Sequence, residues 1–182
     1  NPDQSVALGA AIEAARLASA SAAGGGLFKR DVVKRLADVD VQDRTPHALG
    51  MIAINSQSEL RNTVIIPKGT NVPCEMSRED YQTTRSNQES IDVHLVQGGE
   101  HDGDPAACIP LASYTFSGIP RRPAGKSRVR VTYRYNENTV VDISAVDVES
   151  QRELLQEANP LVDLDDLVGG QGYGVSPVSP RA

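Results

Sequence analysis

The sequence from Ser86 to Gly98 reads Ser-Asn-Gln-Glu-Ser-Ile-Asp-Val-His-Leu-Val-Gln-Gly. Polar residues that suit a turn begin it, and it closes on the glycine pair Gly98-Gly99. In the middle, apolar residues alternate with the residues of a second face: Ile91, Val93 and Leu95 against Asp92, His94 and Val96. This period of two predicts a half-buried β-strand. Such a row lines either the core of a sandwich or the floor of a groove, and periodicity alone leaves both open.

Similar strand-like runs continue on both sides of this stretch. They lie at 47–54, 59–66, 76–85, 109–116, 128–135, 139–146 and 152–156. Turn residues such as Gly, Pro, Asn and Asp separate nearly all of them. About eight short strands with this spacing predict a mainly β fold, a two-layer antiparallel β-sandwich.

The N-terminal residues have a different pattern. Asn1 suits a helix cap, Pro2 suits the first helical position, and Asp3 lies in the first turn. A helix from about residue 3 to 20 is therefore predicted, rich in Ala and suited to close packing in a larger body. Small residues follow at 19–26, and a short charged amphipathic turn at 27–36, so 1–37 is a helical extension with its connector.

Composition also marks the two ends of the β region. Residues 37–43 read Ala-Asp-Val-Asp-Val-Gln-Asp, which places a linker at 38–44 and the sandwich at 45–160. Residues 161–168 mix leucines with acidic residues, as in a short amphipathic helix, an acidic docking motif or a loosely held turn. The rest, to residue 182, is rich in Gly, Ser and Pro and predicts a flexible tail without a helical lid.

Bulk properties exclude several classes. The formal net charge is -6, which argues against a nucleic-acid partner. No apolar run approaches the ~18 residues of a membrane span, and no signal sequence is recognisable, so a cytoplasmic location and no membrane contact are expected. The two cysteines, Cys74 and Cys108, lack the paired spacing of a disulfide framework or a zinc site. We expect both to be semi-buried thiols.

The chain shows no pattern typical of an enzyme. His47, His94 and His101 lack metal-ligand spacing, and no serine or cysteine lies in a nucleophile elbow. Acidic residues alternate in the loop at 100–104, but a calcium loop needs a longer ligand series with a closing carboxylate. We therefore expect no catalytic residue and no bound metal.

Arginines line one face of the strand at 128–135, at positions 128, 130 and 134. They form either a docking stripe for an acidic partner or a solvated outer face that discourages edge-to-edge pairing. The second interpretation is favoured, because long basic side chains on a sheet commonly prevent its pairing with strands of other molecules.

Several short motifs, in the same order, resemble the seventy-kilodalton heat-shock (DnaK-like) chaperones. They are Asn-Pro-Asp at 1–3, Val-Ala-Leu-Gly-Ala-Ala at 6–11, Thr-Pro at 45–46, Leu-Gly at 49–50, Ile-Pro at 66–67, Val-Pro at 72–73, Asn-Gln at 87–88, His-Leu-Val-Gln-Gly at 94–98, Gly-Ile-Pro at 118–120 and Ile-Ser-Ala-Val-Asp at 143–147. The resemblance covers about residues 1–147.

The resemblance implies that residues 1–20 are similar to the last helix of an ATPase domain whose remainder is absent. It implies that the sandwich holds extended apolar segments of unfolded proteins. ATP and magnesium would then bind in the absent domain, so this fragment has no cofactor of its own and is not an enzyme. Co-chaperones of the J-domain and nucleotide-exchange types are the implied partners of the intact protein.

The resemblance also assigns a peptide-binding site. It implies a pocket with Ile91 as floor and Val93 as the next inward residue, with neighbours contributed by two other strands. The walls are Met51 and Tyr81, with Ala53 beside them, and the closing arch is Ile54 and Thr84. Burial of one client leucine contributes about 1.5–3 kcal/mol to the binding free energy. After the entropic cost of association is subtracted, micromolar and promiscuous binding is expected.

The linker and the arch depart from the family pattern. The interdomain linker, Val39, Asp40, Val41, Gln42 and Asp43, has polar residues where the family has apolar ones, and burying an unpaired carboxylate is costly. Thr84 is polar for an arch, and no lid is recognisable. An alternative function is therefore an interaction scaffold that has kept the fold but has lost the binding of clients and its coupling to ATP. We also expect the N-terminal helix, or the tail at 161–168, to occupy a neighbour's groove.

Overall fold

Strands dominate the computed structural model, which describes residues 2–20, 42–55, 57–159 and 175–177. The chain divides into two units, Asn1–Gln42 and Asp43–Ala182. In the first unit, the predicted helix is present as α1 (Pro2–Ala20). Glu13 and Arg16 form an ion pair of 2.7 Å on it, one helical turn apart. Its apolar side chains Val6, Leu8 and Leu17 are exposed.

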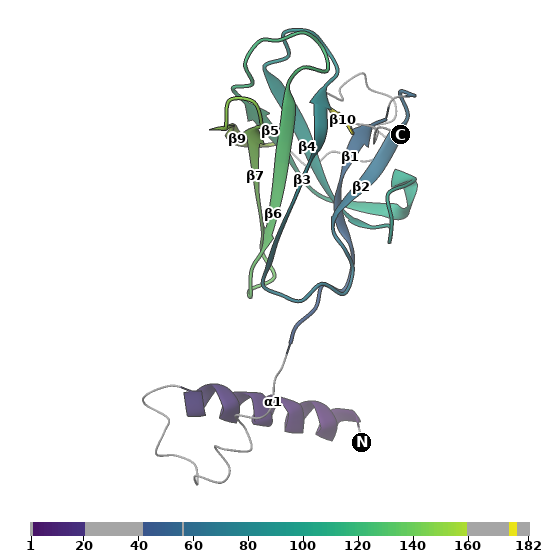
Figure 1. The fold of residues 1–182 in the computed structure, drawn as a ribbon. Coiled ribbons are helices and arrows are strands. Elements are labelled where there is room, and N and C mark those ends of the chain that lie inside the picture. Colours follow the sequence, from purple (N-terminus) through teal and green to yellow (C-terminus); the bar gives the residue numbers. More distant parts are fainter. Residues whose placement is uncertain (1, 21–41, 56, 160–174, 178–182) are drawn as a thin grey trace. The chain divides into compact units, whose positions relative to one another are not determined.

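The second unit is a sandwich of two antiparallel sheets (Figure 1). The first sheet has the order β2-β1-β4-β5-β9, with β1 Leu49–Ile54, β2 Leu60–Ile66, β4 Ser90–Gly98, β5 Cys108–Ser117 and β9 Leu155–Asn159. The second has the order β10-β3-β6-β7-β8, with β3 Cys74–Thr83, β6 Arg128–Tyr135, β7 Val141–Asp147, β8 Arg152–Glu153 and β10 Val175–Pro177. The predicted mainly β, two-layer antiparallel fold with an N-terminal helix is thus confirmed.

The strand boundaries agree with the sequence pattern except near turns. The strand at 128–135 is found as predicted, whereas the run at 139–146 begins only at Val141. Thr139 has a φ of 62°, and Asn136 folds the preceding residues into a turn through its side-chain oxygen. The run at 152–156 is two strands, because the chain passes from the second sheet to the first at the buried Leu154.

The space between the sheets is filled by the inward residues of nearly every strand. Ile91, Val93 and Leu95 of β4 are all at most 4% exposed and belong to this core. Further core residues are Leu49, Met51, Ala53, Ile65, Ile66, Tyr81, Phe116, Ile119, Val129, Val131, Tyr133, Ile143, Ala145 and Leu154. Burial of this apolar surface is the main favourable term in folding.

Two tyrosines of the second sheet form hydrogen bonds with the first sheet across this core. The hydroxyl of Tyr133 donates to the carbonyl oxygen of Gly50 at 3.0 Å. The hydroxyl of Tyr81 lies 2.7 Å from Oγ1 of Thr63, which itself donates to the carbonyl oxygen of Met51 at 3.0 Å. Burial raises the pKa of both tyrosines, so each keeps the proton that it donates.

The outer face of the first sheet is also partly covered. The segment between β4 and β5, which includes the 3-10 turn η1 (Pro105–Ala107), folds back onto β2. Asn62 and Gly103 exchange backbone hydrogen bonds of 2.8 and 3.0 Å. A second cluster, Ile52, Val96 and Cys108, is buried there. The second half of β4 is therefore buried on both faces, where the alternation predicts only one.

Gly50 lies where β1 comes close to β2. A Cβ atom at this position would approach the side chain of Asn62 and lie 2.6 Å from the carbonyl oxygen of Thr63. The same glycine accepts the hydrogen bond from Tyr133. A side chain here would thus push β1 away from both of its contacts.

Replacing Gly50 by alanine is expected to lower the free energy of unfolding by about 1–3 kcal/mol, as overpacking of a dense core does. Urea unfolding followed by circular dichroism measures the change. Gly103→Ala is the matched control, because its nearest non-neighbouring heavy atom would lie 3.8 Å from the new Cβ. Equal losses in the two variants would contradict this account of Gly50.

Candidate functional site

Strand β1 changes its pairing partners along its length. This strand pairs with β4 only from Leu49 to Met51. Beyond Met51 it pairs with β2 alone, as far as Ile54. Both β1 and β3 contact β10, and we call the region defined by Ala53–Ile54 of β1 and Tyr81–Thr83 of β3 the mouth.

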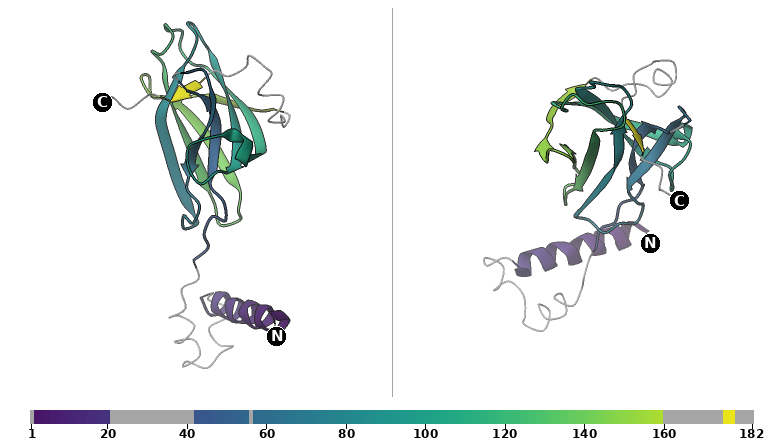
Figure 2. Two further views of the ribbon diagram at one scale, coloured as in Figure 1. Left: turned by 90° about the vertical axis from the view of Figure 1, so that its right-hand side faces the viewer. Right: turned by 45° about the horizontal axis from the view of Figure 1, so that its top comes forward.

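A short extended segment lies in the mouth. β10 pairs antiparallel with β3, with Val175 opposite Thr83, Ser176 opposite Gln82 and Pro177 opposite Tyr81. It also lies beside β1. Figures 1 and 2 show β10, in yellow, next to the strands of the first sheet. These residues belong to the stretch for which composition predicts a flexible tail. The strand β10 was therefore not predicted from the sequence.

The apolar residues proposed for the pocket lie together behind the mouth. Met51, Ala53, Tyr81, Ile91 and Val93 are each at most 1% exposed and belong to one cluster in the core. They come from β1, β3 and β4, which the sequence alone does not bring together. They form one buried apolar group, which we call the apolar wall, on strands of which β1 and β3 contact β10.

The two arch residues are placed differently. Ile54 is partly buried on the other face of β1 and packs against the outer cluster that contains Ile52 and Val96. Thr84 is partly buried and follows the end of β3. Both residues flank the mouth at strand ends, and Ile54 does not share a cluster with Ile91 or Val93.

The turn after Thr84 is held by one side chain. Oε1 of Gln88 accepts hydrogen bonds from the backbone amides of Thr84 at 3.1 Å and Arg85 at 3.3 Å. Its Nε2 atom donates to the carbonyl oxygen of Ser90 at 2.8 Å. The neighbouring Asn87 has a φ of 58°, a conformation that asparagine tolerates better than most residues. The Asn-Gln pair of the sequence thus shapes the β3–β4 turn.

The loop from Gly118 to Ser127 supports the same turn from the other side. The amide of Asn87 donates to the carbonyl oxygen of Arg122 at 2.8 Å. The amide of Gly125 donates to the carbonyl oxygen of Thr83 at 2.8 Å. The amide of Thr83 donates in turn to the carbonyl oxygen of Ser127 at 3.0 Å. The position of the mouth therefore depends on where this loop is anchored.

Asp147, at the end of β7, anchors the loop. Its carboxylate has no exposed surface and lies 2.8 Å from Nη1 of Arg122, and Ser150 also donates to it. Burial alone would raise the pKa of Asp147, but the hydrogen bonds from Arg122 and Ser150 outweigh it and leave the pKa below its ordinary value. The sequence motif at 143–147 ends on this residue, yet the motif alone assigns it no partner.

The proposed interdomain linker is only partly described. Val39, Asp40 and Val41 lie outside the described residues, as do the connector and the segment at 161–168. Gln42 and Asp43 are exposed, and the carbonyl oxygen of Asp43 accepts a hydrogen bond from the amide of Val72 at 2.8 Å. This contact fixes the start of the sandwich to the residues that precede β3.

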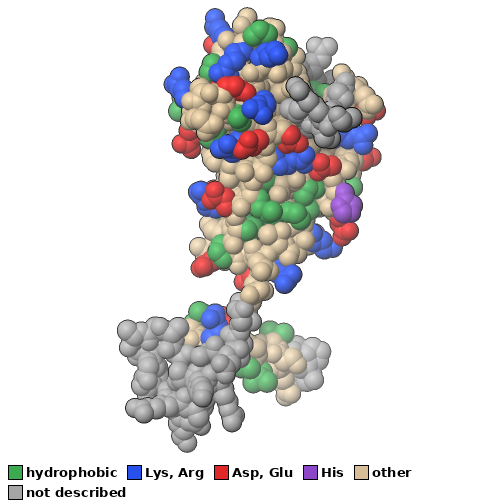
Figure 3. All heavy atoms as spheres, viewed as in Figure 1, with side chains coloured by type: hydrophobic (Ala, Val, Ile, Leu, Met, Phe, Trp, Pro, Cys, Tyr) green, Lys and Arg blue, Asp and Glu red, His purple; other side chains and the backbone are tan. Residues whose placement is uncertain are grey.

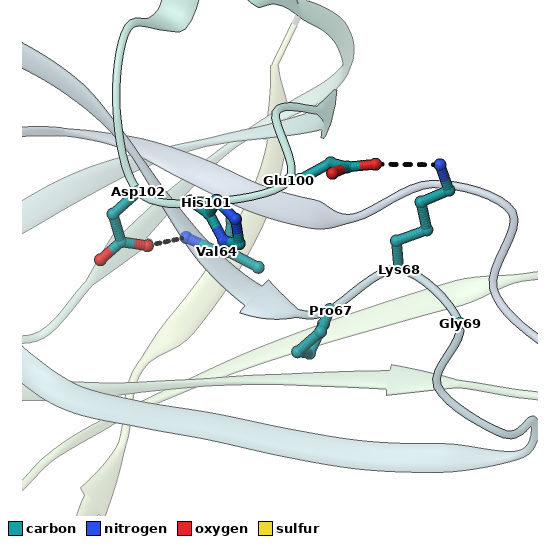
Figure 4. A pocket seen from close by; sticks show the side chains of 7 residues that line it. All are labelled: Val64, Pro67, Lys68, Gly69, Glu100, His101 and Asp102. Carbon is teal, nitrogen blue, oxygen red and sulfur yellow. Dashed lines mark hydrogen bonds and ion pairs between the residues drawn. The ribbon is translucent and has the colours of Figure 1, made fainter.

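The acidic loop at 100–104 lines an open pocket of roughly 700 Å³ on another part of the surface (Figure 4). Glu100 forms an ion pair of 3.0 Å with Lys68, and Asp102 accepts hydrogen bonds from Arg78 and from the amide of Val64. Asp104 caps η1. The carboxylates thus serve separate partners, and the described residues contain no group of three His, Cys, Asp or Glu suited to a metal ion.

The arginine row on β6 is paired with carboxylates of neighbouring elements. Ion pairs of 3.1, 2.6 and 2.9 Å join Arg128 to Glu149, Arg130 to Glu79 and Arg134 to Glu75. Basic and acidic side chains are interspersed on this face (Figure 3). The structure favours the solvated outer face over a docking stripe for an acidic partner.

The buried His94 is a structural residue. Its Nδ1 atom lies 3.0 Å from Oγ of Ser113 on β5, and burial lowers its pKa against a smaller opposing effect of Asp92. Cys74 and Cys108 are free thiols, and burial raises the pKa of each. Such thiols are poorly suited to nucleophilic chemistry.

Comparison with known proteins gives a consistent result. The family model described as "Hsp70 protein" matches residues 1–164. A "Chaperone protein HscA homolog" of Neisseria meningitidis serogroup B is 33% identical over 91% of this chain and 24% of its own length. A "Chaperone protein DnaK" of Trichormus variabilis is 34% identical over 84% of this chain and 19% of its own length. The chain spans about a quarter, or less, of these relatives. No described helix has the length and apolar character needed to cross a membrane.

The anchor at Asp147 predicts a pH dependence of stability. A carboxyl group with a lowered pKa in the folded chain stabilises it above the unfolded pKa, about 3.9, and this contribution is lost as the pH falls through the folded value. Asp147→Asn is expected to lower the free energy of unfolding at pH 7 by about 1.5–3 kcal/mol, because hydrogen bonds to a charged group usually contribute this much to stability.

Urea unfolding of both proteins between pH 7 and pH 2 measures this effect. The difference between the two proteins should be constant down to about pH 4 and shrink below it. Glu75→Gln, in the exposed pair with Arg134, should change stability little at any pH. A difference for Asp147→Asn that persists at pH 2 would refute the assignment.

Proposed function

The chain belongs to the Hsp70 family, and from this premise we propose that residues 45–160 are the client-binding part of a molecular chaperone. The clients are extended apolar segments of unfolded proteins. The observation that carries the proposal is β10, because it supports the mouth as a place where an extended segment pairs with β3. Addition of a strand to a sheet edge is a general mode of peptide recognition.

The chemistry of the mouth suits clients that differ in sequence. Backbone groups at the edge of β3 bind any extended chain, whatever its side chains. The buried wall of Met51, Tyr81, Ile91 and their neighbours favours apolar residues. A buried leucine contributes about 1.5–3 kcal/mol and each backbone hydrogen bond about 0.5–1.5 kcal/mol. After the cost of association, affinities in the micromolar range follow.

We propose that ATP and magnesium act outside this region of the intact protein. The acidic residues of the loop at 100–104 are committed to other partners. Residues 38–44 would connect the sandwich to the nucleotide-binding part, and residues 161–182 would follow it. J-domain and nucleotide-exchange co-chaperones would then regulate the client site through that connection.

The test is a comparison of two labelled peptides of equal length in fluorescence anisotropy with the full 182-residue chain. A leucine-rich peptide is expected to bind with a micromolar Kd, and a peptide of alternating charges at least tenfold more weakly. No substitution is needed, which is an advantage because Ile91 packs in the core. Enlarging it to Phe would itself cost about 1–3 kcal/mol of stability.

Equal, negligible binding of both peptides would refute the proposed function. That result would favour the alternative, an interaction scaffold of the same fold. A charge-dependent preference for the second peptide would also contradict the apolar wall as the determinant. Measurement at low and high salt separates the two contributions, since salt weakens only the electrostatic one.

A further inference from the structure

We propose that the segment Val175–Pro177 is a built-in competitor of clients, which occupies the mouth and lowers client affinity until it is displaced. The inference rests on the proposed function of the mouth. Its basis is the pairing of β10 with β3, at Tyr81 to Thr83, next to β1. A client that adds as a strand at this edge requires the same backbone groups, so the two cannot bind together.

The orientation of β3 identifies the groups that are shared. The amide and carbonyl of Thr83 bond to Ser127 and Gly125, on the side of β6. In an antiparallel strand, the backbone groups of successive residues point to opposite sides. The amide and carbonyl of Gln82 are therefore turned towards β10, where Ser176 lies opposite. Gln82 is the residue for which β10 and a client compete.

The composition of the segment suits a weak occupant. Residues 169–180 contain no charged side chain, so entering an apolar mouth requires no burial of charge. Pro177 favours an extended conformation for Ser176 before it. The segment contains no leucine that could pack against the apolar wall. A leucine-rich client can therefore displace it.

Covalent attachment makes even a weak occupant effective. Residues 160–174 connect β9 to β10, and fifteen residues span at most roughly 50 Å when extended. Tethers of this length give effective concentrations in the millimolar range. An intrinsic affinity of about 0.1 mM would then keep the mouth about nine-tenths filled, and the apparent client affinity about tenfold weaker.

The test is Ser176→Pro in the full 182-residue chain, which removes the amide opposite Gln82. The labelled leucine-rich peptide is expected to bind about tenfold more tightly to this variant. Gly170→Pro is the matched control, since it adds one proline to the same segment outside β10 and should leave the affinity unchanged. A synthetic peptide of residues 173–180, added at millimolar concentration, should compete with the labelled peptide on the Ser176→Pro variant.

Equal affinities of the unchanged chain and Ser176→Pro would overturn the proposal while leaving the client site intact. An effect that grows with protein concentration would overturn it as well, because the segment would then occupy a neighbouring molecule. If neither protein binds the peptide, the proposed function fails. Hydrogen exchange is independent of clients: faster exchange of the Gln82 amide in Ser176→Pro supports docking of β10, and unchanged exchange refutes it.

Discussion

Two buried tyrosines determine how the sheets of this sandwich face one another. Tyr133 bonds to the backbone of β1 at Gly50, and Tyr81 bonds to β2 through Thr63. Apolar packing is not directional, so it fills the core without specifying the register between the sheets. Buried hydroxyls require partners at defined distances, and the close approach at Gly50 makes those distances possible. The relative position of β1 and β3 follows from these contacts.

The mouth is a consequence of the same arrangement. β1 is held to the second sheet at Gly50 and separates from β4 after Met51. On the opposite side, β3 ends in a turn that Gln88 organises and that the loop after β5 supports. The ion pair of Arg122 with the buried Asp147 anchors that loop. The proposed client site would therefore consist mainly of backbone edges, and polar contacts fix where these edges lie.

The proposed occupation of the mouth by Val175–Pro177 would connect client affinity with regulation. Binding through backbone groups is promiscuous, so any nearby extended segment competes for it. Under this proposal, the tethered segment would set an affinity threshold that leucine-rich clients exceed and polar segments do not. Selectivity for apolar clients would then arise from competition as well as from the buried wall.

Most of the strands, the antiparallel sandwich and the family could be predicted from the amino-acid sequence, because period-two alternation, turn residues and ordered motifs are local properties. The resemblance also identified Met51, Tyr81 and Ile91 as neighbours. Three features became visible only in the folded chain: Ile54 packs on the outer face, Asp147 anchors the loop, and a segment expected to be a flexible tail pairs with β3. These features depend on contacts between residues that are distant in the chain, and local sequence patterns do not reveal such contacts.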